Sequence, residues 1–139
     1  MRNLDSIIRL HQWRLDEKRQ KVAELERLAT RFRAEVEQLE TGLKLEQEVA
    51  ARSTEAVTGY GNYALFVVAR RDKLEQSLAE LENAMIQAVE DVTVAFQEFK
   101  KFDLIRAHDR EKAELKKNRA HQRAIDEAGL NLYRRANTN

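Results

Sequence analysis

The chain has 139 residues, of which 42% are hydrophobic and 35% are charged, a composition that fits a single folded domain and excludes a disordered chain. The absence of cysteine excludes disulfides, thiolate nucleophiles and cysteine-based metal sites, and the absence of proline leaves long helices uninterrupted. The net charge is +1, but residues 1–33 and 100–139 carry +4 and +5, whereas residues 34–61 and 62–99 carry −4 each.

The first third of the chain shows a heptad repeat. Six positions spaced by seven are all apolar, and four of the six positions in the complementary register are apolar, with His11 and Lys18 as the interruptions. Only a spacing of 3.5 residues keeps an apolar line facing one partner over this distance, so the pattern predicts a coiled-coil helix over about residues 4–57. The apolar positions are Leu4, Ile8, Leu15, Val22, Leu25, Ala29, Phe32, Val36, Leu39 and Leu43.

The next segment, Thr58 to Asn62, reads as a turn. Gly59 and Gly61 can adopt the left-handed conformation that ends a helix, and Asn62 is a favoured residue at the start of the next helix. The earlier Gly42 lies inside the first predicted helix, where glycine costs about 1 kcal/mol relative to alanine. It marks either a mild bend or a tolerated solvent-facing position.

A second apolar line follows the turn in steps of four and three residues, and it predicts a helix over about residues 63–136. The resulting fold class is all-α: a long two-helix antiparallel coiled-coil hairpin with a C-terminal helical overhang, forming one coiled-coil domain over residues 1–139. The second line comprises Leu74, Leu78, Leu81, Met85, Ala88, Val92, Ala95, Phe99 and Phe102.

The predicted turn also fixes which residues face each other. If Leu43 faces Leu78, the numbers of paired residues sum to about 121, and Ile8 lies opposite Ala113. Residues 118–136 then extend past the N-terminus as a single polar helix that a partner could order. Folding back also brings the charged blocks together, with +9 at the end that holds both termini and −8 at the turn end.

The sequence offers no set of residues for catalysis, so we expect a protein that is not an enzyme and needs no cofactor or metal. No two of His11, His108 and His121 have the spacing that places two ligands on one helical face, and His11 is expected to pack in the seam. The glycines around Tyr60 lack the third glycine and the preceding strand of a dinucleotide site.

Nucleic acid and membranes are not expected as partners. The basic residues of the last forty positions alternate with acidic ones and have no aromatic stacking platform. The longest apolar stretch, residues 64–69, is far too short to span a bilayer, and charges at Arg2, Asp5 and Arg9 interrupt any signal-peptide core.

Aromatic residues outside the seam are candidates for protein contacts. Trp13 is placed to point away from the partner helix, and Tyr60, Tyr63 and Phe66 cluster near the predicted turn. Exposed aromatic side chains are favoured interface anchors. Packing within the hairpin is the alternative for each of them.

Seven segments, spread over nearly the whole chain, form a recognisable pattern. They are Ile7–Leu10, Asp16–Arg19, Tyr60–Ala69, Arg70–Leu74, Ala95–Lys101, Arg110–Glu111 and Asp126–Leu130. Together they resemble the FliJ family of flagellar export proteins in its alphaproteobacterial form, and the match is most specific around residues 70 and 96.

The resemblance implies an antiparallel coiled coil that acts as a stalk in the flagellar type III export apparatus. It implies three kinds of partner: a hexameric export ATPase ring, the cytoplasmic domain of the membrane export gate, and export chaperones. The implied location is the cytoplasmic side of the inner membrane at the flagellar basal body. By position, the ring-facing candidates are Lys18, Arg19, Lys116, Lys117, Arg119 and Arg123, and the gate-facing candidates are Tyr60, Tyr63 and Phe66.

Two other interpretations remain open at this stage. The chain could be a structural coiled coil that self-associates, its seam completed by a second chain. It could also be the equivalent stalk of a virulence-type secretion system, which the sequence hardly separates from the flagellar one.

Overall fold

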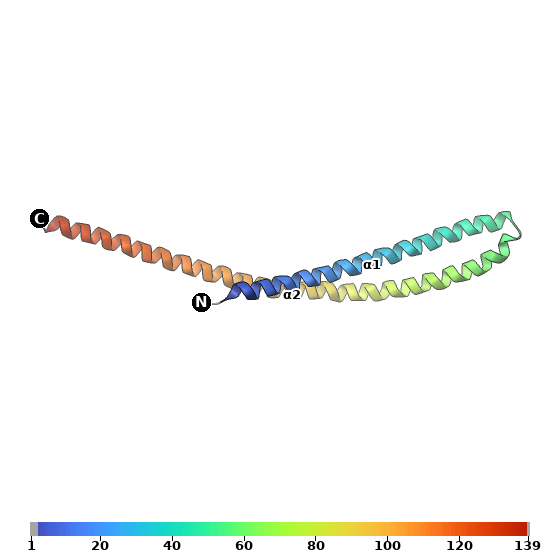
Figure 1. Ribbon diagram of the computed structural model, residues 1–139, viewed down its shortest axis with the longest axis horizontal. Helices are drawn as coiled ribbons and strands as arrows, with labels where there is room; N and C mark the ends of the chain where they lie inside the picture. The colour runs from blue at the N-terminus through green and yellow to red at the C-terminus, as the bar shows by residue number, and fades with distance from the viewer. Residues whose placement is uncertain (1–2, 139) are drawn as a thin grey trace. The chain divides into compact units, whose positions relative to one another are not determined.

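The computed structural model describes residues 3–138 and contains two α-helices joined by a short turn (Figure 1). Helix α1 spans Leu4–Arg52 and helix α2 spans Ala56–Asn137. Asn3, a favoured N-cap residue, precedes α1, and Asp5 lies in its first turn, where a negative charge complements the helix dipole. At the other end of the chain, the Thr138 hydroxyl donates a hydrogen bond to the Arg134 carbonyl at 2.9 Å.

The two helices pack against each other in an all-α antiparallel hairpin, as the heptad pattern predicts, and α2 continues beyond the start of α1. The contacts divide the chain into two units. The hairpin unit consists of Trp13–Phe96, and the terminal unit combines Met1–Gln12 with Gln97–Asn139.

The hairpin unit has its core along the predicted seam. Leu25 and Ala29 of α1 form a buried cluster with Leu81 and Ala88 of α2. Partly buried apolar side chains pack around this cluster. Each of them lies three or four residues along the chain from a residue of the cluster. They are Val22, Leu28, Phe32, Leu78 and Met85.

The terminal unit packs the start of α1 against the middle of α2. Leu4 and Ile8 are buried, and the His11 ring stacks on Phe102 with 4.8 Å between ring centroids. The Arg106 guanidinium contacts the Asp5 carboxylate at 3.3 Å. Beyond this pairing, every described residue from 111 to 138 is exposed, which confirms the predicted overhang.

The predicted turn at Thr58–Asn62 is wrong, and so are the helix ends next to it. The chain reverses at Ser53–Glu55, and Gly59 and Gly61 lie within α2 without a positive φ. Serine and threonine side chains compete for backbone hydrogen bonds and favour turns, and both residue types occur at this reversal. In addition, the heptad line of apolar residues in α1 ends at Leu43. The packing of the core outweighs the cost of about 1 kcal/mol for each helical glycine.

The predicted register is wrong for the same reason. The numbers of two residues that contact each other between α1 and α2 sum to 105 for Glu35 with Arg70 and to 113 for His11 with Phe102. The sequence predicts a sum of about 121. Leu43 therefore does not face Leu78, and Ile8 does not face Ala113. The overhang consequently begins earlier than residue 118.

Adjacent arginines in α2 have opposite roles in this packing. Arg70 contacts the Glu35 carboxylate of α1 at 2.8 Å. Arg71 occupies a seam position between Val67 and Leu74, and within the described chain its buried Nε has no hydrogen-bond partner, the Glu75 carboxylate lying 4.0 Å away.

These contacts predict opposite effects for the same substitution at neighbouring positions. Arg71→Leu should stabilise the protein by about 1 kcal/mol, because an apolar side chain replaces a polar group that is buried without a partner. Arg70→Leu should destabilise it by up to about 1 kcal/mol, because it removes a partly exposed ion pair. Urea unfolding followed by far-UV circular dichroism measures both, and shifts in the same direction would contradict this account.

Candidate partner-binding surfaces

In the hairpin unit, Trp13 is 62% exposed, so its indole points away from α2 as predicted. Lys18 and Arg19 are also exposed, and Arg19 makes a loose contact of 3.8 Å with Asp16 on its own helix. All three side chains are therefore accessible on α1. Their role in binding a partner remains a prediction.

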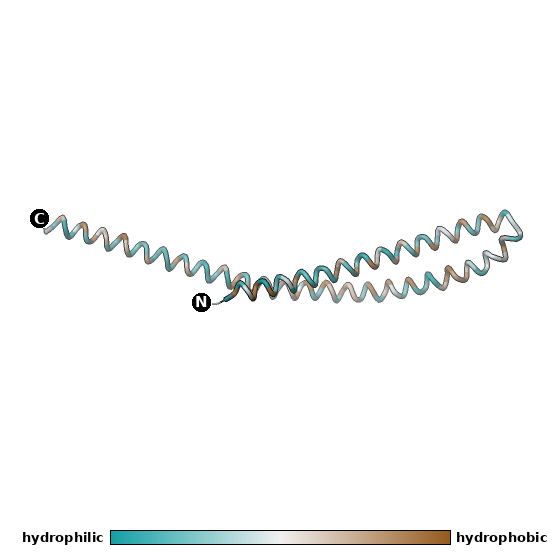
Figure 2. The backbone as a smooth tube through the Cα atoms, viewed as in Figure 1, coloured by the Kyte–Doolittle hydropathy of each residue, from teal (hydrophilic) through white to brown (hydrophobic). Residues whose placement is uncertain are grey.

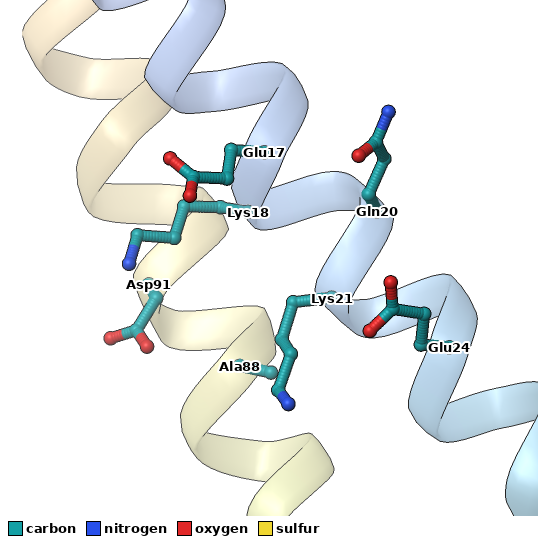
Figure 3. Close-up of a pocket in the computed structure, with 7 residues that line it drawn as sticks. All are labelled: Glu17, Lys18, Gln20, Lys21, Glu24, Ala88 and Asp91. Carbon is teal, nitrogen blue, oxygen red and sulfur yellow. The ribbon is translucent and has the colours of Figure 1, made fainter.

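Lys18 also lines a groove between the two helices of this unit (Figure 3). The stems of Lys18 and Lys21 leave α1 toward α2, where Ala88 and Asp91 lie. Because Ala88 is small, the long lysine stems can cover the apolar floor while their ammonium groups stay in water. The groove is lined by both acidic and basic side chains. Such a lining matches the mixed charge of a protein surface better than it matches a phosphate group or a metal ion.

The aromatic residues predicted at the turn lie within α2 instead. Phe66 is 60% exposed, whereas Tyr60 and Tyr63 are half-buried. Tyr63 packs across the hairpin on Gly42, where an added Cβ would lie 2.5 Å from the tyrosine hydroxyl. Gly42 is therefore not an idle surface position, since it makes room for Tyr63.

This contact predicts a coupling between the two positions. In a Tyr63→Phe background, Gly42→Ala should stabilise the protein by about 1 kcal/mol through helix propensity, because the nearest remaining ring atom is at an ordinary contact distance. In the wild-type background the gain should shrink or reverse, because the hydroxyl must move. Thermal unfolding of the four variants measures the coupling, and strictly additive effects would contradict the contact.

We call residues 114–137 the tail. Four of its basic side chains were predicted as candidates, and the structure brings three of them together: Lys116, Arg119 and Arg123 line one face. The same face includes Lys112 and the half-exposed Leu115, which sequence reasoning missed. Lys117 does not line this face. All the described tail residues are exposed, and Figure 2 shows isolated hydrophobic positions among hydrophilic ones along it.

The charge differs between the two units. The terminal unit has 13 basic and 8 acidic residues, a net charge of +5, and the hairpin unit has 12 basic and 16 acidic residues, a net charge of −4. A net positive charge favours acidic surfaces over basic ones, and this preference weakens as salt screens the charges.

Sequence reasoning also missed an exposed apolar line on α2, which we call the outer stripe: Ile86, Val89, Thr93 and Phe96. Ile86 is 69% exposed, Val89 52% and Phe96 45%. The spacing of three and four residues outside the seam is the signal that could have revealed it.

Among residues 3–138, no group of acidic or histidine side chains could hold a metal ion. Neither helix contains, within the same residues, a segment that is long and apolar enough to cross a membrane.

Together, the paired seam, the charged terminal unit and the exposed tail define an α-helical hairpin protein of the coiled-coil class. The chain belongs to the flagellar FliJ protein family, whose family model matches residues 1–138. This membership gives it a role related to flagellar export. No curated protein and no solved structure gives a significant match to the chain.

Proposed function

We propose that this protein is a non-enzymatic stalk and adaptor of the flagellar type III export apparatus. It inserts into the ring of the export ATPase, promotes assembly and activity of the ring, and links the ring to the cytoplasmic domain of the export gate at the inner membrane. Export chaperones are further partners. The observation that carries the proposal is the match of the FliJ family model to residues 1–138.

The architecture supports this role. The tail is a single helix exposed on every side, with three cations and Leu115 on one face. A ring of identical subunits around such a helix cannot make the same contact with each subunit. Unequal contacts favour different states of different subunits, because a ligand shifts a conformational equilibrium by its difference in affinity for the states.

The hairpin unit supplies candidate contacts for the gate. Phe66 is exposed on α2, and Tyr60 is half-buried near it in sequence. Tyr63 is less available, because it packs on Gly42. Phe66 is therefore the stronger gate-facing candidate of the three.

The decisive experiment mixes the full chain with its export ATPase and measures both ATP hydrolysis and formation of hexamers. We expect both to rise with the concentration of the added chain until one chain is present per ring. If neither quantity changes, the stalk role is contradicted. A mixture with an unrelated coiled-coil protein of similar length is the control.

A further inference from the structure

Four exposed cations lie on one line along α2, which we call the cationic line: Lys112, Lys116, Arg119 and Arg123. Their spacing of four, three and four residues keeps them within about 60° of arc, since each residue turns the helix by about 100°. The four side chains line one groove on this face. From the first cation to the last, the line is about 16 Å long.

The helix separates basic and acidic residues that alternate in the sequence. Glu111 and Glu114 lie about 110° and 170° around the helix from the middle of the cationic line. Asp109 and Asp126 lie three residues outside its two ends, about 50° to the side. Positive charge is therefore confined to one narrow face, and carboxylates bound it at both ends.

The cations of this line repel one another. Each neighbouring pair is three or four residues apart, a spacing at which like charges destabilise a helix. The two middle members, Lys116 and Arg119, have no carboxylate at either spacing on their helix. Every described residue from 111 onward is exposed, and a single helix is marginal in water. Anionic groups placed along the line would therefore relieve the repulsion and stabilise the helix.

The surroundings of the line decide which anionic partner fits. A nucleic acid duplex and an anionic bilayer both present negative charge over lengths much greater than the line, so they would also meet Asp109 and Asp126. A helix on a bilayer needs apolar residues beside its cations, but Ile125 and Leu132 lie about 150° and 170° away. An acidic patch on a protein can match the line in length.

A second copy of the chain does not offer such a patch on either helix. Its acidic residues occupy at most two successive positions at steps of three or four residues, as Glu37 with Glu40 and Asp72 with Glu75 do. Four cations in a row therefore have no counterpart of equal length on one helix of this chain. A different protein is the better match.

We propose that the cationic line docks on an acidic patch, about 16 Å long, on the surface of a different protein. Lys116 and Arg119 make the central contacts, and Leu115 packs beside them. Lys117, about 130° around the helix, takes no part. The inference rests on the proposed function only for the name of the partner, which is then the export ATPase.

The test titrates the full chain into a fluorescein-labelled peptide of about twelve glutamates, a length that spans the line as a helix, and follows the fluorescence anisotropy. Changing Lys116 and Arg119 together to glutamine should raise the dissociation constant about fivefold at low salt, and less at high salt. The control changes Lys117 and Arg135 to glutamine. It removes the same charge from exposed positions about 130° from the line, so its effect should stay below about twofold.

Hydrogen exchange of the tail amides supplies a second measurement. Without the peptide, the Lys116→Gln, Arg119→Gln variant should exchange more slowly than the wild type, because like-charge repulsion is removed. The control should not, since Lys117 lies three residues from Glu114, an oppositely charged neighbour. Adding the peptide should slow exchange in the wild type and in the control.

Several results would overturn the proposal. Equal losses of peptide affinity in the two variants would show that the face of the helix is irrelevant. Tighter binding to a DNA duplex, or to vesicles of phosphatidylserine and phosphatidylcholine, at equal concentration of negative charge would assign the line to another partner. Self-association that the line variant abolishes would assign it to a second copy.

The export ATPase separates this inference from the proposed function. A wild type that stimulates the ATPase, with both variants stimulating it equally well, would overturn the inference and leave the proposed function standing. A chain that binds the peptide through the cationic line but does not stimulate the ATPase would support the inference and contradict the proposed function.

Discussion

Leu81→Ala should destabilise the hairpin unit by about 2–3 kcal/mol, the largest effect that we expect of a single substitution. Leu81 is only 9% exposed and belongs to the buried cluster with Leu25, Ala29 and Ala88. Truncation to alanine removes apolar contacts and leaves a cavity between two helices, one of which already presents the small Ala29. Urea unfolding followed by circular dichroism measures the change.

Leu65→Ala is the matched control for this prediction. Leu65 lies on the same helix and is 72% exposed, so the same truncation there should change the free energy of unfolding by no more than about 0.5 kcal/mol. Similar losses at the two positions would show that the seam is not the core of the hairpin unit.

Neutralising Lys116, Lys117, Arg119 and Arg123 together to glutamine should raise the concentration of the chain needed to stimulate the export ATPase about tenfold at low salt. This expectation rests on the proposed function and on a few tenths of a kcal/mol for each exposed charge. The substitutions lower the net charge of the terminal unit from +5 to +1. The loss should be smaller at high salt, because screening already weakens these interactions in the wild type.

The control for the tail variant removes the same number of charges elsewhere. Arg14, Arg27, Arg31 and Arg33 are all exposed on α1 in the hairpin unit, and their joint change to glutamine lowers the net charge by the same amount. We expect this control to stimulate the ATPase nearly as the wild type does. Equal losses in both variants would assign the effect to overall charge, and equal losses at both salt concentrations would contradict the electrostatic explanation.

The residues of the seam could be predicted from the sequence, but the alignment of α1 against α2 along the seam could not. Periodicity identifies Leu25, Ala29, Leu81 and Ala88 as inward-facing, since a repeat of 3.5 residues has one face. It does not say which heptad of α1 meets which heptad of α2, because successive heptads look alike. The prediction took the alignment from Gly59 and Gly61, and these glycines are helical because core packing outweighs their local preference.

The candidate surfaces divide in the same way. The exposure of Trp13 and of the tail cations follows from their places outside the seam, so sequence reasoning found them. The packing of Tyr63 on Gly42 depends on the alignment of the two helices and could not be foreseen with the wrong turn. The outer stripe was missed because it lies on a second face of α2. The seam on the first face already accounted for the apolar repeat of this helix.

Two ion pairs join α1 to α2 among the described residues, Asp5 with Arg106 in the terminal unit and Glu35 with Arg70 in the hairpin unit. Sliding one helix past the other by seven residues would return apolar side chains to the seam, yet it would separate both pairs of charges by about 10 Å. Their partly exposed carboxylates and guanidinium groups therefore favour the native alignment over alignments that are shifted by one heptad. The buried leucines and alanines discriminate much less, because apolar side chains occupy the seam in each of these alignments.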